Sequence, residues 1–286
     1  MNPAPISTDG RGDLSGGSLS LREVSERLGV HYMTAYRYVR TGRLPAFKRD
    51  GEWAVEAGDL ERLQDRRGSP SSGRGYPAYP RRVPALTDRL IAGDEGGAWA
   101  LVQSVLAGGA VPSDVYLELF VPALRLIGER WERGEIGIAD EHCATVVMQR
   151  LIGRMGPLFR RPGRPRGIVV VGAPEGELHA LPTALAADLL RTHGFVVVDL
   201  GANVPTDSFV DCVRRLTRVI AVGIAVTTTG RHAVAGRLVE ALRRADVGVP
   251  IILGGSGIDE LDARKLGADQ WANGAGRLVG LLTEPI

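Results

Sequence analysis

The sequence has few of the residues that build disulfide frameworks or membrane spans. Cysteine occurs twice in 286 residues, at Cys143 and Cys212. Two thiols are too few for a disulfide framework or a cysteine zinc site, and they fit a reducing compartment. No uninterrupted apolar run approaches the ~18 residues of a membrane helix, and the N-terminus has no basic-then-apolar secretion signal. The sequence therefore predicts a soluble, cytoplasmic protein with no membrane partner.

Charge is nearly balanced, at a formal net charge of +2, and the apolar fraction of 44% is enough for sizeable cores. The length allows two or three domains of roughly 100–200 residues each. Residues 1–17 are rich in Gly, Ser and Pro without periodicity, which predicts a disordered tail. Residues 65–83 are dense in Pro, Gly, Ser and Arg, which predicts an extended linker. The linker would separate a small first domain from the rest of the chain.

Residues 18–64 have the pattern of a small DNA-binding domain. Ser20 and Glu23 have the spacing of a capping box that opens a helix, and a second helix is expected at 32–41. Asp-Gly at 50–51 lies between two short strand-like runs, which predicts a hairpin, and a third short helix follows it. Helix, turn, helix and hairpin wing is a layout that places the second helix in the major groove of DNA.

Basic residues dominate positions 31 to 49, where no acidic residue occurs. A face of one sign suits the polyanionic DNA backbone; the alternative is a small interaction domain with a solvated basic face. The stretch resembles the MerR and excisionase-type winged helix-turn-helix family, which implies a double-stranded DNA operator as partner. The predicted DNA-contacting residues are Tyr32, Thr34, Tyr36, Arg37 and Arg40 on the second helix, and Lys48 and Arg49 on the wing.

Residues 84–160 have helical apolar spacing throughout. Four helices are expected, near 85–92, 97–107, 113–131 and 139–159, and they predict a four-helix bundle. The two predicted apolar stripes consist of Leu119, Ala123, Leu126, Ile127 and Trp131, and of Ala144, Met148, Leu151, Ile152, Met155 and Phe159.

The pattern changes at residue 167, where short Val- and Ile-rich runs begin to alternate with helical stretches. The runs are 167–172, 195–201, 219–226 and 250–255, and the helical stretches are 182–193, 206–217, 232–246 and 259–267. Buried strands alternating with helices indicate βαβ units. We expect a multidomain α and α/β protein whose residues 167–286 form a flavodoxin-like, doubly wound parallel sheet of five strands, with ligands at the carboxyl ends of the strands.

Polar and small residues follow three of these expected strands. His179 follows the first, and Glu177 can accept a hydrogen bond from its imidazole and fix the tautomer, as carboxylates do for metal-binding histidines. Taken alone, a lone histidine such as His179 is more commonly a surface-loop residue without a ligand. The later strand ends carry Thr227, Thr228 and Thr229, and then Gly254 and Gly255. Hydroxyls and closely approaching backbone at adjacent strand ends predict a slot for a long polar appendage.

These strand ends resemble the cobalamin-binding domain family. Its Asp-x-His-x-x-Gly motif corresponds here to Glu177-x-His179-x-x-Pro182, with glutamate in place of aspartate and proline in place of glycine. The resemblance implies that His179 replaces the cofactor's own base as the lower cobalt ligand. It also implies that the nucleotide tail runs along the sheet past Thr227, Thr228, Gly254 and Gly255.

The helical segment adds Trp131, ten positions before the pair Glu141 and His142. Taken alone, the tryptophan could be a core anchor and the pair a solvated helical turn. The spacing resembles the helical cap of the CarH-type, adenosylcobalamin-dependent, light-sensing repressors, which also begin with a MerR-like domain. The resemblance implies that Trp131 packs over the upper axial group, with Glu141 and His142 close by. Glu132 is a departure, because that family has there a histidine that binds cobalt after illumination.

The sequence thus predicts a cobalamin-sensing, DNA-binding transcriptional regulator that is not an enzyme. Adenosylcobalamin is the expected form and methylcobalamin the alternative, and a homo-oligomer, either dimer or tetramer, is expected. One other class is a corrinoid carrier for methyl transfer. Another is a regulator that binds haem or a protein partner through the same domain.

Overall fold

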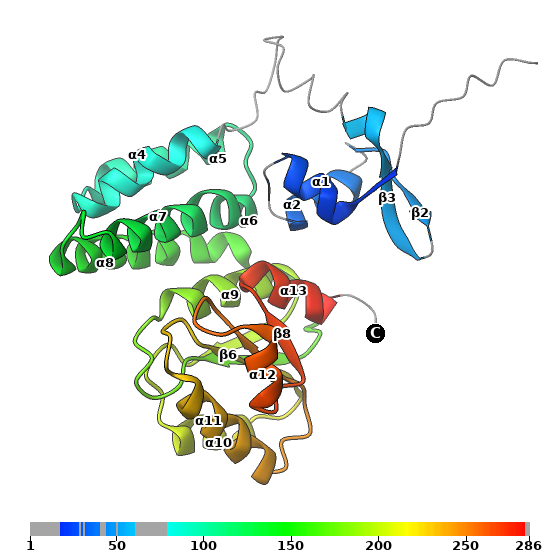
Figure 1. Cartoon of the computed structure of the whole chain (residues 1–286), viewed down its shortest axis with the longest axis vertical. Helices are drawn as coiled ribbons and strands as arrows, with labels where there is room; N and C mark the ends of the chain where they lie inside the picture. The colour runs from blue at the N-terminus through cyan, green and yellow to red at the C-terminus, as the bar shows by residue number, and fades with distance from the viewer. Residues whose placement is uncertain are drawn as a thin grey trace, which may run out of the picture. The chain divides into compact units, whose positions relative to one another are not determined.

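The computed structural model describes residues 18–28, 30, 32–40, 44–49, 51–60 and 79–283 (Figure 1). The predicted disordered tail lies outside the described residues, as does most of the predicted linker. The chain divides into two compact units, Met1–Ser72 and Gly73–Ile286. Each unit is described separately below.

The first unit combines two helices with a small antiparallel sheet. Its elements are β1 (Ser18–Ser20), α1 (Leu21–Leu28), α2 (Tyr32–Arg40), β2 (Phe47–Arg49) and β3 (Glu52–Glu56), followed by helical residues 57–60. The strand order is β1-β3-β2, so β3 pairs with both neighbours. The two helices and the hairpin lie where the sequence predicts them. Strand β1 was not predicted, because three residues are too few to show an alternating pattern.

Local chemistry accounts for these elements. The backbone N–H of Ser20 donates to the Glu23 carboxylate at 2.8 Å, and the N–H of Glu23 donates back to Ser20 Oγ at 3.3 Å, as in a capping box. Arg49 pairs with Glu52 across the hairpin, so the connecting loop has two residues. Gly51 has φ +88°, which a glycine adopts without strain. Among the described residues of this unit, the fully buried apolar side chains include those of Val24, Ala35, Leu44, Val55 and Leu60.

The second unit begins with a helical bundle. Its elements are α4 (Tyr79–Ile91), α5 (Glu95–Ala107), α6 (Pro112–Val115), the π-helix η1 (Tyr116–Phe120), α7 (Val121–Glu132), α8 (Ile138–Met155) and the 3₁₀ turn η2 (Gly156–Phe159). All four predicted helices are present, and the third is the continuous run from α6 to α7. The predicted stripe on α8 is buried over its whole length. The predicted stripe on α7 is not, because Leu126 is half-buried and Trp131 is 50% exposed.

Helix α4 corrects the predicted linker, since it begins at Tyr79 rather than after residue 83. Pro80 lies in the first turn, where its missing N–H has no intrahelical partner to lose. Pro84 does cost one hydrogen bond, but Tyr79, Leu86 and Leu90 are buried in the bundle core. Burial of these side chains outweighs the helix-breaking tendency of the two prolines.

The rest of the second unit is a parallel sheet between layers of helices (Figure 1). The chain runs through β4 (Ile168–Gly172), α9 (Leu181–Thr192), β5 (Val196–Asp199), α10 (Thr206–Arg215), β6 (Val219–Ala225), α11 (His232–Arg244), β7 (Ile251–Gly254), α12 (Glu260–Lys265), β8 (Gln270–Ala272) and α13 (Ala275–Thr283). The strand order is β5-β4-β6-β7-β8, with every pair parallel. This is the doubly wound, flavodoxin-like order that the sequence predicts.

The bundle and the sheet share one hydrophobic core. A single cluster of buried residues joins bundle side chains such as Met148 and Met155 to Leu185 on α9 and Val169 on β4. The opposite face of the sheet packs against α10, α11 and α12 in a second cluster. No helix in the described part of the chain is long and apolar enough to cross a membrane.

A buried polar contact also joins the two parts of this unit. The Tyr116 hydroxyl, on the π-helix, donates to Asp188 on α9 at 2.8 Å. Arg191 donates to the other oxygen of Asp188 at 2.7 Å. Burial, reinforced by the charge of Asp188, raises the pKa of Tyr116 well above its usual value. The hydroxyl therefore remains a donor, and the contact ties the bundle to the helix that follows His179.

Candidate functional site

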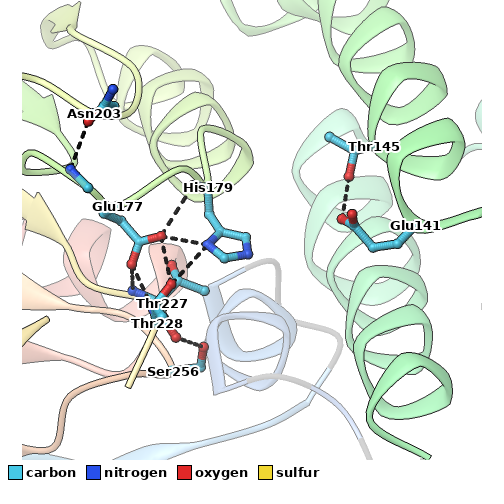
Figure 2. Close-up of polar contacts among 9 residues, drawn as sticks. Glu141, Thr145, Glu177, His179, Asn203, Thr227, Thr228 and Ser256 are labelled. Carbon is cyan, nitrogen blue, oxygen red and sulfur yellow. Dashed lines mark hydrogen bonds and ion pairs between the residues drawn. The ribbon is translucent and has the colours of Figure 1, made fainter. Parts of the chain in front are cut away.

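The loop between β4 and α9 presents His179 on a buried carboxylate (Figure 2). Nδ1 of His179 lies 2.5 Å from Oε1 of Glu177. The Glu177 side chain is fully buried, whereas the His179 side chain is 52% exposed. An ionised carboxylate only accepts hydrogen bonds, so Nδ1 carries a proton, and in the neutral ring Nε2 carries the lone pair. This is the tautomer and orientation of a metal-binding histidine.

Glu177 is held in its ionised form by several donors. Its Oε2 accepts the backbone N–H groups of Thr227 at 2.8 Å and Thr228 at 2.7 Å, and the Thr228 hydroxyl donates to Oε1 at 3.1 Å. Burial alone would raise the pKa of Glu177, but hydrogen bonds from His179, Thr228 and Thr227 outweigh it and lower that pKa to about 2. In return, the hydrogen bond to Glu177 raises the pKa of His179 against the opposing effect of burial.

Asn203 fixes the loop that carries these two residues. Its Oδ1 accepts the N–H of Gly176 at 2.7 Å, and its own N–H donates to the carbonyl of Glu177 at 2.8 Å. Asn203 has φ +56°, a conformation that asparagine tolerates better than most residues. Sequence reasoning missed this residue. The available signal was an asparagine shortly after the second strand, at the same sheet edge as His179.

A cavity of about 70 Å³ lies between the carboxyl half of the sheet and helices α9 and α13. Gly254 and Gly255 line it, and so do Pro182 and Thr183 at the start of α9. A Cβ atom on Gly254 would lie 2.3 Å from the carbonyl oxygen of Ala272, so only glycine fits this close approach. The predicted slot was polar, but the cavity lining is mainly apolar, and Thr227 and Thr228 lie outside it.

One buried hydroxyl at this edge has no partner. Oγ1 of Thr227 is buried and makes no hydrogen bond with any residue that the structure describes. Leaving a buried hydroxyl unpaired is costly, so a polar ligand atom at this position would be favourable. Within the described ranges, no three side chains of His, Cys, Asp or Glu gather to hold a metal ion. His179 thus offers a single imidazole, which suits a metal that already has its other ligands.

Exposed apolar side chains lie on the bundle as well as on the His179 loop. Trp131 is 50% exposed and Val146 on α8 is 48% exposed, whereas Leu178, next to His179, is 72% exposed. Exposed apolar side chains mark a binding surface where they form a contiguous patch, whereas single ones are common on protein surfaces. The exposure of Trp131 argues against its being a core anchor.

Glu141 lies on α8 on the side that faces the His179 loop (Figure 2). It accepts the Thr145 hydroxyl at 2.9 Å, and its negative charge contributes to the raised pKa of His179. His142 is exposed, with Nε2 3.6 Å from Glu141 Oε2. Glu132, at the end of α7, is also exposed. The structure thus brings Glu177, His179, Thr227 and Thr228 into direct contact, with Glu141 nearby on the bundle.

The predicted DNA-contacting residues differ in exposure. Tyr32 is 39% exposed, and Lys48 and Arg49 on β2 are exposed, with Arg49 donating to Ser18 Oγ at 3.0 Å. Thr34 is only 3% exposed because it lies on the core side of α2, so its predicted contact with DNA requires correction. Tyr36 is half-buried. The side chains of Arg37 and Arg40 lie outside the described part of the structure.

Three domain families match the chain. Residues 84–155 and residues 167–279 match two families that are each described as a B12 binding domain. Residues 18–68 match a family described as a helix-turn-helix domain. The chain therefore combines corrinoid-binding domains with an N-terminal helix-turn-helix domain. This agrees with the single imidazole, the cavity and the unpaired hydroxyl at the sheet edge.

Corrinoid proteins are among its curated relatives. The trimethylamine corrinoid protein of Methanosarcina barkeri is 29% identical over 192 residues, which are 65% of this chain and 88% of that protein. The dimethylamine corrinoid protein of the same organism is 27% identical over 204 residues, 70% of this chain and 94% of that protein. The structure of the Methanosarcina barkeri monomethylamine corrinoid protein has the same fold, with a TM-score of 0.63 at 19% identity over 69% of this chain and 95% of that one.

Proposed function

We propose that this chain is a DNA-binding transcriptional regulator that senses cobalamin, most favourably adenosylcobalamin, and catalyses no reaction. One observation carries the proposal: a helix-turn-helix match at residues 18–68 precedes the two B12-binding domains. The alignments with the two corrinoid proteins named above cover 88% and 94% of those proteins but 65% and 70% of this chain. About a third of this chain therefore has no counterpart in those alignments, and a methyl carrier does not need a DNA-binding domain.

The residues at the sheet edge suit the lower side of the cofactor. Glu177 keeps the proton on Nδ1 of His179, so that Nε2 is available to cobalt. The closely packed backbone at Gly254 and Gly255 would border the nucleotide tail, and the unpaired Thr227 hydroxyl, which lies outside the cavity, would offer the bound cofactor a hydrogen bond. When bound, adenosylcobalamin supplies a cobalt–carbon bond that light can break.

Three residues of the bundle suit the upper side of the cofactor. Trp131 presents an exposed aromatic face near the end of α7, and Glu141 and His142 follow near the start of α8. This arrangement resembles the cap of the CarH-type light-sensing repressors, in which such residues cover the adenosyl group. Glu132 replaces the histidine of that family, and a carboxylate is a poorer ligand for Co(III) than an imidazole. We therefore propose a light response without a stable upper histidine ligand.

Regulation in this proposal works through self-association. An oligomer holds several helix-turn-helix domains together, which raises their effective concentration at adjacent half-sites without any new contact. The cofactor changes DNA binding only if it binds one assembly state more tightly than the other. The proposed partners are thus a double-stranded operator and further copies of the chain.

A methyl-transfer corrinoid carrier is the second candidate, and the names of the relatives favour it. A carrier and a regulator would both bind cobalamin through His179. They differ in whether DNA is a partner, so the test must measure cofactor binding and DNA binding together.

The full-length chain, loaded with adenosylcobalamin in the dark, should be used to select binders from a random duplex library. The regulator proposal expects an enriched sequence, and expects its affinity to change on illumination or on removal of the cofactor. Added haem is the control ligand, and it should not give a stable complex. A chain that binds cobalamin but enriches no duplex would instead be a carrier.

A further inference from the structure

A group of exposed arginines lies at the amino-terminal edge of the parallel sheet, at the other end of β4 from His179. The sequence contains no Asp or Glu from residue 142 to 174 or from 212 to 239. The first of these segments leads from α8 into β4, and the second leads from α10 into β6 and beyond. The arginine edge consists of Arg160, Arg161, Arg164, Arg166, Arg215 and Arg218, all of which are exposed.

Hydrogen bonds join the first segment to the second, and to the turn before β5, at this edge. The N–H of Ile168 donates to the carbonyl of Arg218, and the N–H of Arg166 donates to the carbonyl of Gly194, both at 3.0 Å. The guanidinium of Arg218 also donates to the carbonyl of Pro165 at 3.5 Å. The arginines therefore extend from backbone that is anchored to the sheet.

Two of the guanidinium groups are held in defined positions without a carboxylate. That of Arg166 lies over the ring of Phe195, 4.9 Å from its centroid. That of Arg218 contacts only a backbone carbonyl among the described residues. Guanidinium groups that are held by a ring face or a carbonyl keep other N–H donors free for an acceptor.

The backbone of Arg218 is unusual as well. Its φ of +65° lies in the left-handed region, where a side chain other than Gly, Asn or Asp is uncommon. Such a conformation costs on the order of 1 kcal/mol, and strain of this kind is often found at functional sites. The folded chain thus bears a conformational free-energy cost at Arg218, the residue that places a guanidinium group on this edge.

We propose that the arginine edge is a second DNA-contacting surface, which binds backbone phosphates of the duplex that the helix-turn-helix domain recognises. Guanidinium groups form paired hydrogen bonds with phosphate oxygens, and a row of them matches the repeating phosphates of a duplex. Binding by the helix-turn-helix domain would also raise the local concentration of DNA around the rest of the chain. Phosphate contacts carry no sequence information, so this surface adds affinity but no sequence preference. The inference rests on the proposed function.

The test compares three full-length variants with the unmodified chain on the selected duplex, from 50 to 200 mM salt. The edge variant is Arg164→Gln/Arg166→Gln/Arg218→Gln. The control, Arg125→Gln/Arg237→Gln/Arg264→Gln, removes the same charge from exposed sites on α7, α11 and α12. The third variant, Lys48→Gln/Arg49→Gln, changes the first unit. Affinity falls as salt rises, and each lost phosphate contact makes the plot of log affinity against log salt less steep by about 0.9.

The edge variant should lower that slope by about two to three, with sequence preference unchanged, while the control stays close to the unmodified chain. Equal slopes for the edge variant and the control, with weaker binding by Lys48→Gln/Arg49→Gln, would overturn this inference and leave the proposed function standing. Absence of duplex binding by the unmodified chain would overturn both. Loss of binding to phosphatidylglycerol vesicles, with an unchanged DNA slope, would assign the edge to lipid and overturn the inference.

The absorption spectrum of bound cobalamin checks that each variant is folded. If the edge variant does not fold, Arg161→Gln/Arg164→Gln carries the same test, since neither of these side chains contributes to the backbone anchoring described above. With two contacts removed, the expected decrease in slope is about two. An unchanged slope in this variant would also overturn the inference.

Discussion

Glu177 is the residue on which the geometry of the site depends, because one carboxylate accepts hydrogen bonds from two strand ends. Replacing it by glutamine keeps the size but adds an N–H₂ group that must face either the two threonine N–H groups or the imidazole. In the first case the two threonine N–H groups face the amide N–H₂, so that donors face a donor and no hydrogen bond forms. In the second case Nδ1 of His179 must accept, and the proton moves to Nε2. We expect Glu177→Gln to cost about 1–3 kcal/mol in unfolding free energy, measured by urea denaturation, and to weaken cobalamin binding.

Glu175→Gln is the matched control, since Glu175 is exposed in the same loop. It should leave both the unfolding free energy and the cobalamin affinity close to those of the unmodified chain. Equal effects of the two substitutions would contradict the role given to Glu177.

A separate prediction concerns His179. Replacing its side chain removes the proposed axial nitrogen but leaves the Glu177 carboxylate with its backbone donors from Thr227 and Thr228. His179→Ala should weaken cobalamin binding and shift the visible spectrum of whatever cofactor remains bound. The control is His193→Ala, whose ring contacts the carbonyl of Leu189 at the far end of α9. An unchanged spectrum and affinity in His179→Ala would rule out the assignment of the lower ligand.

Glu132 bears on the light response. We expect the unmodified chain to lose its cofactor, or to return to the dark state, faster after illumination than Glu132→His, because only the variant offers an imidazole at that position. The absorption spectrum and the oligomer size, followed after a light pulse, measure this difference. A stable spectrum with two imidazole ligands in the unmodified chain would indicate another histidine, with His142 the first to test.

At the scale of elements, the contact between the π-helix η1 and α9 connects the bundle to the sheet. Tyr116→Phe removes the hydroxyl that donates to Asp188 and leaves that carboxylate with Arg191. We expect a loss of about 1–3 kcal/mol in unfolding free energy. Leu178→Ala, an exposed change in the His179 loop, is a control that should cost little.

The same contact predicts a dependence on alkaline pH. The pKa of Tyr116 is raised in the folded chain, so its contribution is complete below the unfolded value of about 10 and decreases as pH rises above it. Between pH 9 and 11, the unfolding free energy of the unmodified chain should therefore fall more steeply than that of Tyr116→Phe. Parallel curves would show that the hydroxyl does not contribute in this way.

Regular elements were predictable from the sequence where apolar spacing alone determines them. The buried stripe of α8 and the Val-rich strands β4 and β6 are examples, because their side chains are buried on the faces that the spacing indicates. Strand β1 and the start of α4 were not predictable in this way. Pairing with β3 forms the first, and burial of Tyr79 stabilises the second against two prolines, so both depend on distant parts of the chain.

The candidate site shows the same difference between local contacts, which the sequence predicts, and contacts between distant residues, which it does not. Glu177 and His179 are two residues apart, so their hydrogen bond could be predicted from sequence. The bond of Asn203 to Gly176 and that of Tyr116 to Asp188 join residues 27 and 72 positions apart, and only the folded structure reveals them. The exposure of Trp131 was likewise hidden, because helical spacing does not indicate where the bundle core ends.

At the scale of the whole molecule, the first unit has its own core and the second unit contains the complete candidate cofactor site. We expect deletion of residues 1–72 to leave the cobalamin spectrum and affinity unchanged and to abolish sequence-specific binding to the selected duplex. Absorption titration and fluorescence anisotropy measure the two properties. Retained sequence-specific binding in the shortened chain would contradict the role of the helix-turn-helix domain.

The continuous core between bundle and sheet has a consequence for how such a chain can be assembled by recombination. The two matched B12-binding families meet near residues 156–166, but removing either half would expose the apolar surface that it covers on the other half. We therefore expect recombination to transfer the bundle and the sheet together, as one unit. A domain with its own core can be added before that unit, or lost from it, without disturbing the packing between bundle and sheet.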